Sequence, residues 1–82
     1  MWKQGTISVP DKNDKEHLTV CHYWVKVYDT PSAEYGIDGG RISKLTIKKD
    51  GEITANYDRG WDIEPKDEST RLAYMILLQN YN

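Results

Sequence analysis

The residues whose types most readily suggest chemistry are His17, Cys21 and His22, which lie close together in the sequence. A zinc site needs three or four nitrogen, sulfur or oxygen ligands that converge on one ion. Residues 18–28 are rich in β-branched and aromatic residues, so the segment is predicted to be an extended strand whose side chains alternate between two faces. His17 and Cys21 then point away from His22, and without a bulge they form neither a metal site nor a thiol–base pair. We therefore predict no metal, no cofactor and no catalytic residue here.

Four carboxylates near predicted turns form a second candidate group: Asp38, Asp58, Asp62 and Glu64. General acid–base catalysis needs two carboxyl groups at a fixed separation, with the pKa of one raised by burial. Aspartates beside glycines are mostly turn residues, so we expect structural ion pairs instead. The acidic partner is expected to be Asp58 or Asp62. The basic partner is expected to be Arg59 or Arg41, and the pair would tie the long loop at 29–40 to the turn after the fourth strand.

The glycine-rich run GIDGG at 36–40 has the composition of a loop that binds an anion through backbone amides. It lacks the Lys-Ser/Thr pair of a phosphate-binding loop. It also lacks the preceding strand and following helix of a dinucleotide site. We therefore predict a turn, permitted by glycine, that leads into the third strand.

Composition limits the class of protein. The 82 residues form a single domain, residues 1–82, with three tryptophans and six tyrosines but no phenylalanine. The formal net charge of −2 gives no indication of a nucleic-acid partner. The single cysteine, Cys21, excludes an intramolecular disulfide and favours a reducing compartment. The N-terminal residues lack the apolar segment of a signal peptide, and no apolar run approaches about 18 residues, so we expect a cytoplasmic protein with no signal peptide and no membrane segment.

The chain is predicted to hold four strands and then one helix. The expected strands are residues 5–9, 18–28, 41–48 and 52–57, and residues 29–40 form a long connection in which Ser32 caps one helical turn. The expected fold is α+β: a four-stranded antiparallel β-meander with one C-terminal α-helix packed on one face (ββββα). In the second strand, Val25 and Val27 share one face while Leu18 and Val20 share the other. Either a bulge turns all four inward, or one end of the strand is covered on both faces.

The turn between the third and fourth strands is expected to be a three-residue loop, Lys49 to Gly51, with Gly51 at positive φ. This register places Ile47 opposite Ile53 and Leu45 opposite Ala55, so that apolar residues share a face. A two-residue loop would place Ile47 opposite a threonine.

The helix is expected to begin with Pro65 at its first position, followed by Asp67 and Glu68 near the positive end of the helix dipole. Its apolar face is broad. Three helix residues are expected to be buried: Leu72, Ile76 and either Leu77 or Met75. Their expected contacts on the sheet are Val25, Leu45, Ile47 and Ile53.

The sheet face turned away from the helix is the candidate binding surface. If Val25 points inward, then His22, Trp24, Lys26 and Tyr28 point outward, and the hairpin sends Lys44, Thr46 and Lys48 to the same side. The candidate partner-binding residues are Trp24, Tyr28, Lys26, Lys44 and Tyr35. The alternative is that these aromatic residues only stabilise cross-strand pairs, or that Trp2 or the long loop covers Trp24.

Three classes of function are open. The first is a non-enzymatic protein-interaction or adaptor module that binds a protein partner or itself. The second is single-stranded nucleic-acid binding through the exposed sheet face, by base stacking and phosphate contacts, although the net acidity works against it. The third, a small enzyme, is disfavoured because no catalytic motif is present.

A resemblance is carried by two stretches, YGIDGGRISKLTI (35–47) and NYDRGWD (56–62). They resemble a family of small uncharacterised proteins of Gram-positive bacteria, whose members are often encoded on phages or integrated conjugative elements. The resemblance implies a bacterial cytoplasmic setting and mobile-element biology. It implies no activity and no catalytic residues.

Overall fold

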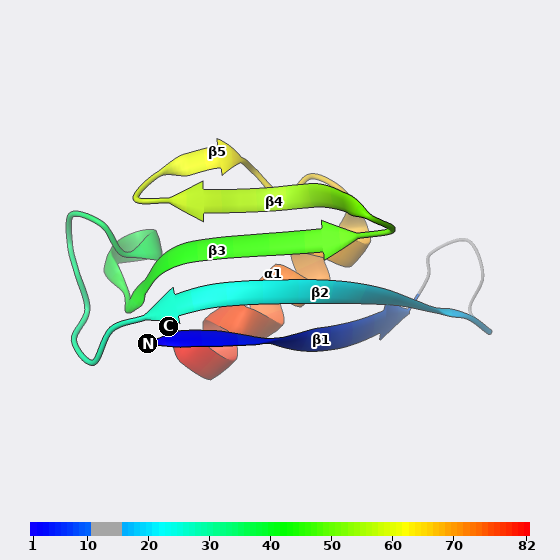
Figure 1. Ribbon diagram of the computed structural model, residues 1–82, viewed down its shortest axis with the longest axis horizontal. Helices are drawn as coiled ribbons and strands as arrows, with labels where there is room; N and C mark the ends of the chain where they lie inside the picture. Colours follow the sequence, from blue (N-terminus) through cyan, green and yellow to red (C-terminus); the bar gives the residue numbers. More distant parts are fainter. Residues whose placement is uncertain (11–15) are drawn as a thin grey trace.

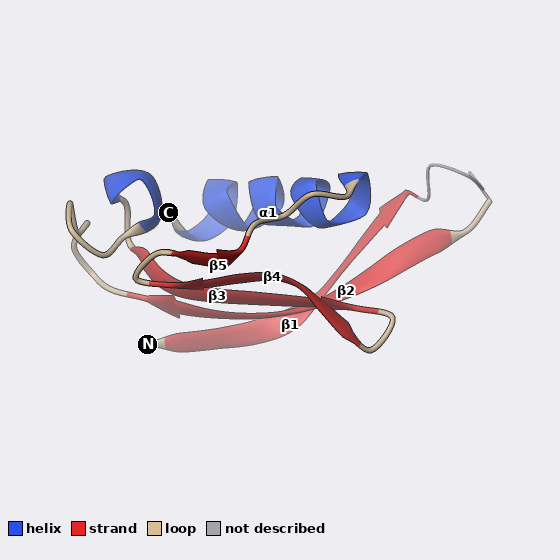
Figure 2. Cartoon of the chain, turned by 90° about the horizontal axis from the view of Figure 1, so that it is seen from above, coloured by secondary structure: helices blue, strands red, loops and turns tan. Residues whose placement is uncertain are grey.

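The computed structural model describes residues 1–10 and 16–82, which form one antiparallel sheet covered on one face by a helix (Figures 1 and 2). The strands follow one another in chain order: β1 (Trp2–Pro10), β2 (Leu18–Val27), β3 (Ile42–Lys49), β4 (Glu52–Asp58) and β5 (Trp61–Ile63). A short 3₁₀ turn, η1 (Ile37–Gly39), precedes β3, and the helix α1 (Glu68–Tyr81) follows β5. The predicted α+β meander with a C-terminal helix is confirmed, and β5 adds a strand that was not predicted. In the described residues, no helix is both long and apolar enough to cross a membrane.

The first two strands pair without interruption, from Trp2 opposite Lys26 to Pro10 opposite Leu18. The bulge expected inside β2 is therefore absent from this pairing, and no element of residues 1–10 and 16–82 supplies the cover expected over one end. Leu18 and Val20 are instead exposed on the outer face. The irregularity lies at the end of β2, where the pairing with β3 shifts after Lys26.

The β3–β4 hairpin differs from the predicted register. Asp50 and Gly51 both have positive φ, 52° and 78°, so a two-residue turn of the I′ kind joins the strands. The positive φ of Gly51 was predicted, but the three-residue loop was wrong. Thr54 is left unpaired, because Lys48 lies opposite Ile53 while Ile47 lies opposite Ala55.

This bulge turns Ile53 to the outer face, where it is 48% exposed. The predicted pairing of Ile47 with Ile53 is wrong, and so is that of Leu45, which lies opposite Tyr57. The inner face still receives an apolar set, because the bulge restores the alternation from Ala55 onward. A two-residue turn with a bulge thus buries Ala55, as the three-residue loop was expected to do, but it leaves Ile53 exposed.

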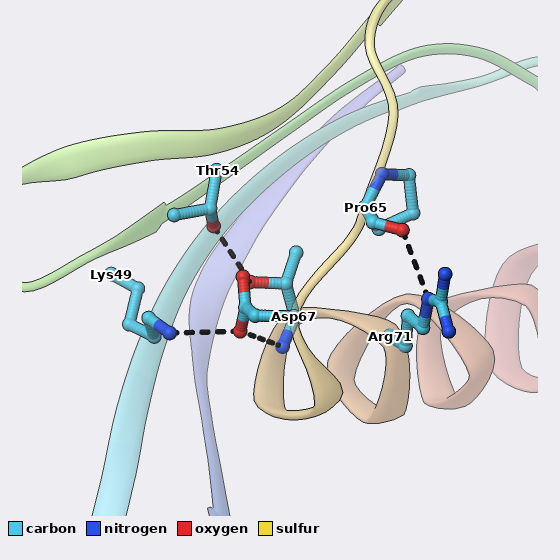
Figure 3. Close-up of polar contacts among 6 residues, drawn as sticks. Lys49, Thr54, Pro65, Asp67 and Arg71 are labelled. Carbon is cyan, nitrogen blue, oxygen red and sulfur yellow. Dashed lines mark hydrogen bonds and ion pairs between the residues drawn. The ribbon is translucent and has the colours of Figure 1, made fainter.

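The start of α1 is determined by Asp67 (Figure 3). Its Oδ2 accepts the Thr70 backbone N–H at 3.0 Å and lies 2.8 Å from Lys49 Nζ, while its Oδ1 accepts the Thr70 hydroxyl at 2.7 Å. Pro65 lies before the helix, where its carbonyl accepts a hydrogen bond from Arg71. The prediction of Pro65 as the first helical residue is therefore wrong, because Asp67 supplies the stronger N-cap.

The charge of Asp67 is stabilised by these contacts. Its partial burial alone would oppose ionisation, but hydrogen bonds from Lys49 and Thr70 outweigh that effect and lower the pKa of Asp67 to about 2. The Thr70 hydroxyl also lies 2.8 Å from that of Thr54, the bulged residue of β4. The helix N-terminus is thereby joined to both strands of the hairpin.

The inner face of α1 is narrower than predicted. The residues that it buries are Thr70, Ala73 and Leu77, and the small size of the first two lets the helix lie close to the sheet. Leu77 is buried as predicted, and Leu72 is partly buried. Ile76 is 38% exposed, so the expectation that it is buried was wrong. The sheet side of the core includes Cys21, Val25, Leu45, Ile47 and Ala55.

The connection between β2 and β3 is held to the end of α1. The Ser32 hydroxyl accepts the Tyr35 N–H at 3.1 Å, so the predicted capped turn is confirmed. Ile37 is buried in the core. The Asn82 side chain donates to the Ile37 carbonyl at 3.1 Å and accepts the Ile42 N–H at 3.0 Å. The C-terminal residue thus lies against the connection, as Figure 2 shows.

Candidate interaction surface on the open face of the sheet

The outer sheet face carries the side chains that the alternation predicted. In the β2–β3 ladder, His22 lies opposite Lys48, Trp24 opposite Thr46, and Lys26 opposite Lys44. Directly opposed residues of an antiparallel pair share a face. The intervening Val25 and Leu45 are fully buried on the helix side, so these six residues lie on the side away from α1. We call this side the open face.

Trp24 lies at the centre of the open face and is 37% exposed. Its indole N–H donates to the Gln4 side-chain oxygen at 2.9 Å, which fixes the orientation of the ring. A shallow hollow beside it is lined by Trp2, Trp24, Thr46, Lys48 and Ile53. Sequence reasoning missed Ile53, because the predicted hairpin register placed it in the core. Trp2 was considered only as a cover for Trp24, whereas it lies beside Trp24 and both rings are exposed.

A second hollow lies at the end of the open face, next to the connection between β2 and β3. Tyr28, Tyr35, Lys44 and Arg59 are among the residues that line it. Lys26 lies over the Tyr28 ring at 5.4 Å from its centroid, and a hydrogen bond from Lys26 together with its charge lowers the pKa of the Tyr28 hydroxyl. The structure therefore brings Tyr28, Tyr35 and Lys44 together, places Lys26 beside them, and leaves Trp24 in the neighbouring hollow.

The predicted tie between the long loop and the turn after β4 exists, but different contacts make it. The Arg59 guanidinium lies 5.1 Å from the centroid of the Tyr35 ring, and the Tyr57 hydroxyl donates to the Tyr35 carbonyl at 3.1 Å. Asp58 instead lies 3.7 Å from Lys44, and Asp62 accepts a hydrogen bond from Asn56. Arg59 has a positive φ of 61° and lies in the turn between β4 and β5.

The residues first considered for chemistry are separated. Cys21 is fully buried on the helix side, where burial raises the pKa of its thiol and the charge of Lys49 partly opposes that rise. His22 is exposed on the open face. Among residues 1–10 and 16–82, no group of three or more His, Cys, Asp or Glu side chains is placed to hold a metal ion.

The glycine-rich segment is occupied by the protein's own groups. The backbone amides of Gly39 and Gly40 donate to the carbonyls of Gly36 and Ile37. A side chain at Gly40 would overlap the side chain of Asn82. The segment is therefore a close-packed turn into β3, as predicted.

The comparisons with known proteins identify a family. A family model that describes a domain of unknown function, DUF7678, matches residues 1–82. Neither a curated protein nor a solved structure matches the chain. The match agrees with the expected kinship to small uncharacterised proteins. It assigns no activity, ligand or partner, so a function has to be inferred from the geometry.

Proposed function

We propose that this chain, which belongs to the DUF7678 family, is a non-enzymatic protein-interaction module that binds a protein partner through the open face. The observation that carries the proposal is that solvent-exposed apolar and aromatic side chains lie beside lysines on a sheet face that no described element covers. Trp24 and Ile53 share a hollow with Lys48, and Tyr28 shares one with Lys44. Tryptophan and tyrosine supply much of the binding energy in protein interfaces.

The expected partner segment carries acidic and apolar side chains. Lys26 and Lys48 lie along β2 and β3, so carboxylates of the partner would meet them as apolar side chains enter the hollow beside Trp24. Trp24 is already oriented by Gln4, so little side-chain freedom is lost on binding.

Single-stranded nucleic acid is the second candidate, because lysines beside exposed aromatic rings also suit stacked bases and phosphates. The carboxylates on the β4 side of the same face work against it. Asp58 already pairs with Lys44, and Asp62 is held at this face by Asn56. A nucleic-acid backbone that crossed the strands would bring its phosphates close to these carboxylates. A short protein segment can bind over β2 and β3 alone and does not have to reach them.

The proposed setting is the cytoplasm of a bacterium, with the encoding gene on a mobile element, as the resemblance of residues 35–47 and 56–62 implies. Cys21 supports a reducing compartment, because it is a free thiol buried in the core. Nothing in the fold depends on a disulfide.

The test compares the wild type with the double variant Trp24→Ala, Tyr28→Ala. Each protein is immobilised, exposed to lysate of the native host, and the affinity of any captured partner is then measured with purified components. We expect the double variant to bind that partner at least about tenfold more weakly, which corresponds to about 1.4 kcal/mol. Met75→Ala removes an exposed apolar side chain from the helix instead and is expected to bind as the wild type does.

Two results would contradict the proposal. One is a purified partner that binds the double variant as tightly as the wild type. The other is a fluorescent single-stranded oligonucleotide that binds the wild type, with an affinity that falls steeply as salt is raised, while no protein partner depends on Trp24. Circular dichroism of both variants shows whether the fold is retained.

A further inference from the structure

β1 is a long edge strand that is open on one side. It spans nine residues and pairs only with β2 among the described strands. Its central run at 4–9, QGTISV, carries no charged side chain. Edge strands of natural proteins are usually short, bulged, charged or covered, since an open edge is a template for pairing with another strand. The opposite edge, β5, follows that rule with three residues.

The helix extends this edge with an apolar surface. Tyr74 packs against Trp61 of β5 with ring centroids 5.3 Å apart, so that side of α1 points toward β5. Ile76 follows Tyr74 by two residues, about 200° around the helix, and therefore points to the opposite side, toward β1. Leu72 is one turn before Ile76 on that same side and is partly buried. In Figure 1 the C-terminal half of α1 lies behind β1 and reaches past its open edge.

We propose that a second copy of this chain pairs with β1, strand against strand in antiparallel orientation, and that the sheet continues across the two copies. A register centred on Thr6 uses all nine residues and places Trp2 opposite Pro10 of the other copy. It places Lys3 opposite Val9 of the other copy, so no like charges are opposed. The strand is thus complementary to itself.

The same symmetry brings the helices together. The two-fold axis of such a pair stands perpendicular to the sheet, so both helices lie on the same face. Each copy then directs Ile76 and Leu72 toward the seam. This accounts for an isoleucine that stays 38% exposed on a helix whose other side is packed. A foreign strand would also pair with the edge, but it would bring no matching helix to cover Ile76.

The pairing leaves the open face uncovered, because it uses the strand edge and the helix layer. It is independent of the protein-binding role proposed above, and either can fail without the other. The dimer would carry two open faces, one on each copy, which would raise its avidity for a partner with repeated binding segments.

Charge substitutions at the two-fold axis test the proposal. Thr6 is exposed and opposes itself, so Thr6→Lys places two lysines opposite each other, and Thr6→Glu places two glutamates. Sedimentation velocity of the wild type over a range of concentrations should show a dimer. Each variant alone should dissociate about fivefold more readily, and an equimolar mixture of the two should regain wild-type affinity.

Matched controls separate this surface from a general effect of charge. Val20→Lys adds the same charge on the outer face of β2, one strand away from the seam, and should leave the dimer unchanged. Ile76→Lys should weaken the dimer, whereas Met75→Lys, at a neighbouring position that is 62% exposed, should not. A wild type that stays monomeric at millimolar concentration would overturn the proposal, as would a dimer that Thr6→Lys leaves intact.

Discussion

The tightest backbone approach among the glycines lies at Gly36. A Cβ atom there would overlap the carbonyl oxygen of Gly40, which cannot move because it accepts the Ser32 N–H at 2.9 Å. We expect Gly36→Ala to lower the free energy of unfolding by about 2–3 kcal/mol, in the range of substitutions that disrupt a packed site. Urea denaturation followed by tryptophan fluorescence measures the change.

Gly60 provides the control for that prediction. A Cβ atom there meets open space, and its φ lies outside the left-handed region. Gly60→Ala should therefore be neutral or slightly stabilising, since alanine reduces the freedom of the unfolded chain. A Gly36→Ala variant that is as stable as Gly60→Ala would show that the 36–40 turn is not closely packed.

Single residues also mark the limits of prediction from sequence. The turn at GIDGG was predictable because glycine is a local signal. The role of Asn82 was not, because its side chain bonds residues about 40 positions earlier in the chain. Ile53 was assigned to the wrong face because both hairpin loops allow positive φ at Gly51. The two-residue turn has Asp50 at positive φ, and the bulge that follows places the Thr54 hydroxyl against that of Thr70 in the helix, a contact that no local pattern indicates.

At the scale of elements, the start of α1 should depend on pH through Asp67. The folded pKa of Asp67, about 2, lies below the ordinary value of 3.8, so the folded state favours the ionised carboxylate. Its contribution to stability is complete above about pH 5 and is lost as the pH falls through 4 toward 2. Because the side chain is 38% exposed and water screens its charge, we expect a contribution of about 1 kcal/mol.

Asp67→Asn isolates the charge, since asparagine caps a helix about as well as aspartate does. The difference in free energy of unfolding between wild type and Asp67→Asn should be largest at neutral pH and should shrink at pH 2. Asp29→Asn removes an exposed carboxylate from the connection after β2 and should show no such trend. A difference that is constant with pH would mean that the ion pair with Lys49 does not stabilise the helix start.

The elements that were hardest to predict are those with weak local signals. The four longer strands were found because alternation and β-branched residues extend over several positions. β5 has only three residues, too few for alternation to be visible. It is held by its pairing with β4 and by the Trp61 ring, which packs edge-on against Tyr57 and against Tyr74 of α1, and the helix contact has no local signal in the sequence. The helix was predicted from the spacing of its apolar residues. Ile76 was wrongly expected to be buried, because this spacing does not distinguish a large exposed residue from a small buried one such as Ala73.

At the scale of the whole molecule, the core lies on one side of the sheet. The open face was predictable from the alternation of Trp24 and Val25, since neighbouring strand residues point to opposite faces. The extent of the open face was not predictable. Trp2 lies on this face because β1 begins earlier than expected, and Ile53 lies on it because of the bulge in β4. A sheet covered on one face leaves the other free for binding, provided that stability depends on the covered face alone.

Whether stability depends on the covered face alone can be tested with two large-to-small substitutions on opposite faces of the sheet. Leu45 is fully buried beneath α1, and Leu45→Ala should lower the free energy of unfolding by about 2–5 kcal/mol. Trp24 is partly exposed and is held by the bond to Gln4 and by contacts across the strands, so Trp24→Ala should cost about 1 kcal/mol or less. Urea denaturation of both variants, followed by far-ultraviolet circular dichroism, gives the comparison. If Trp24→Ala costs as much as Leu45→Ala, the aromatic residues of the open face are part of the structural core, and their exposure is not available to a partner.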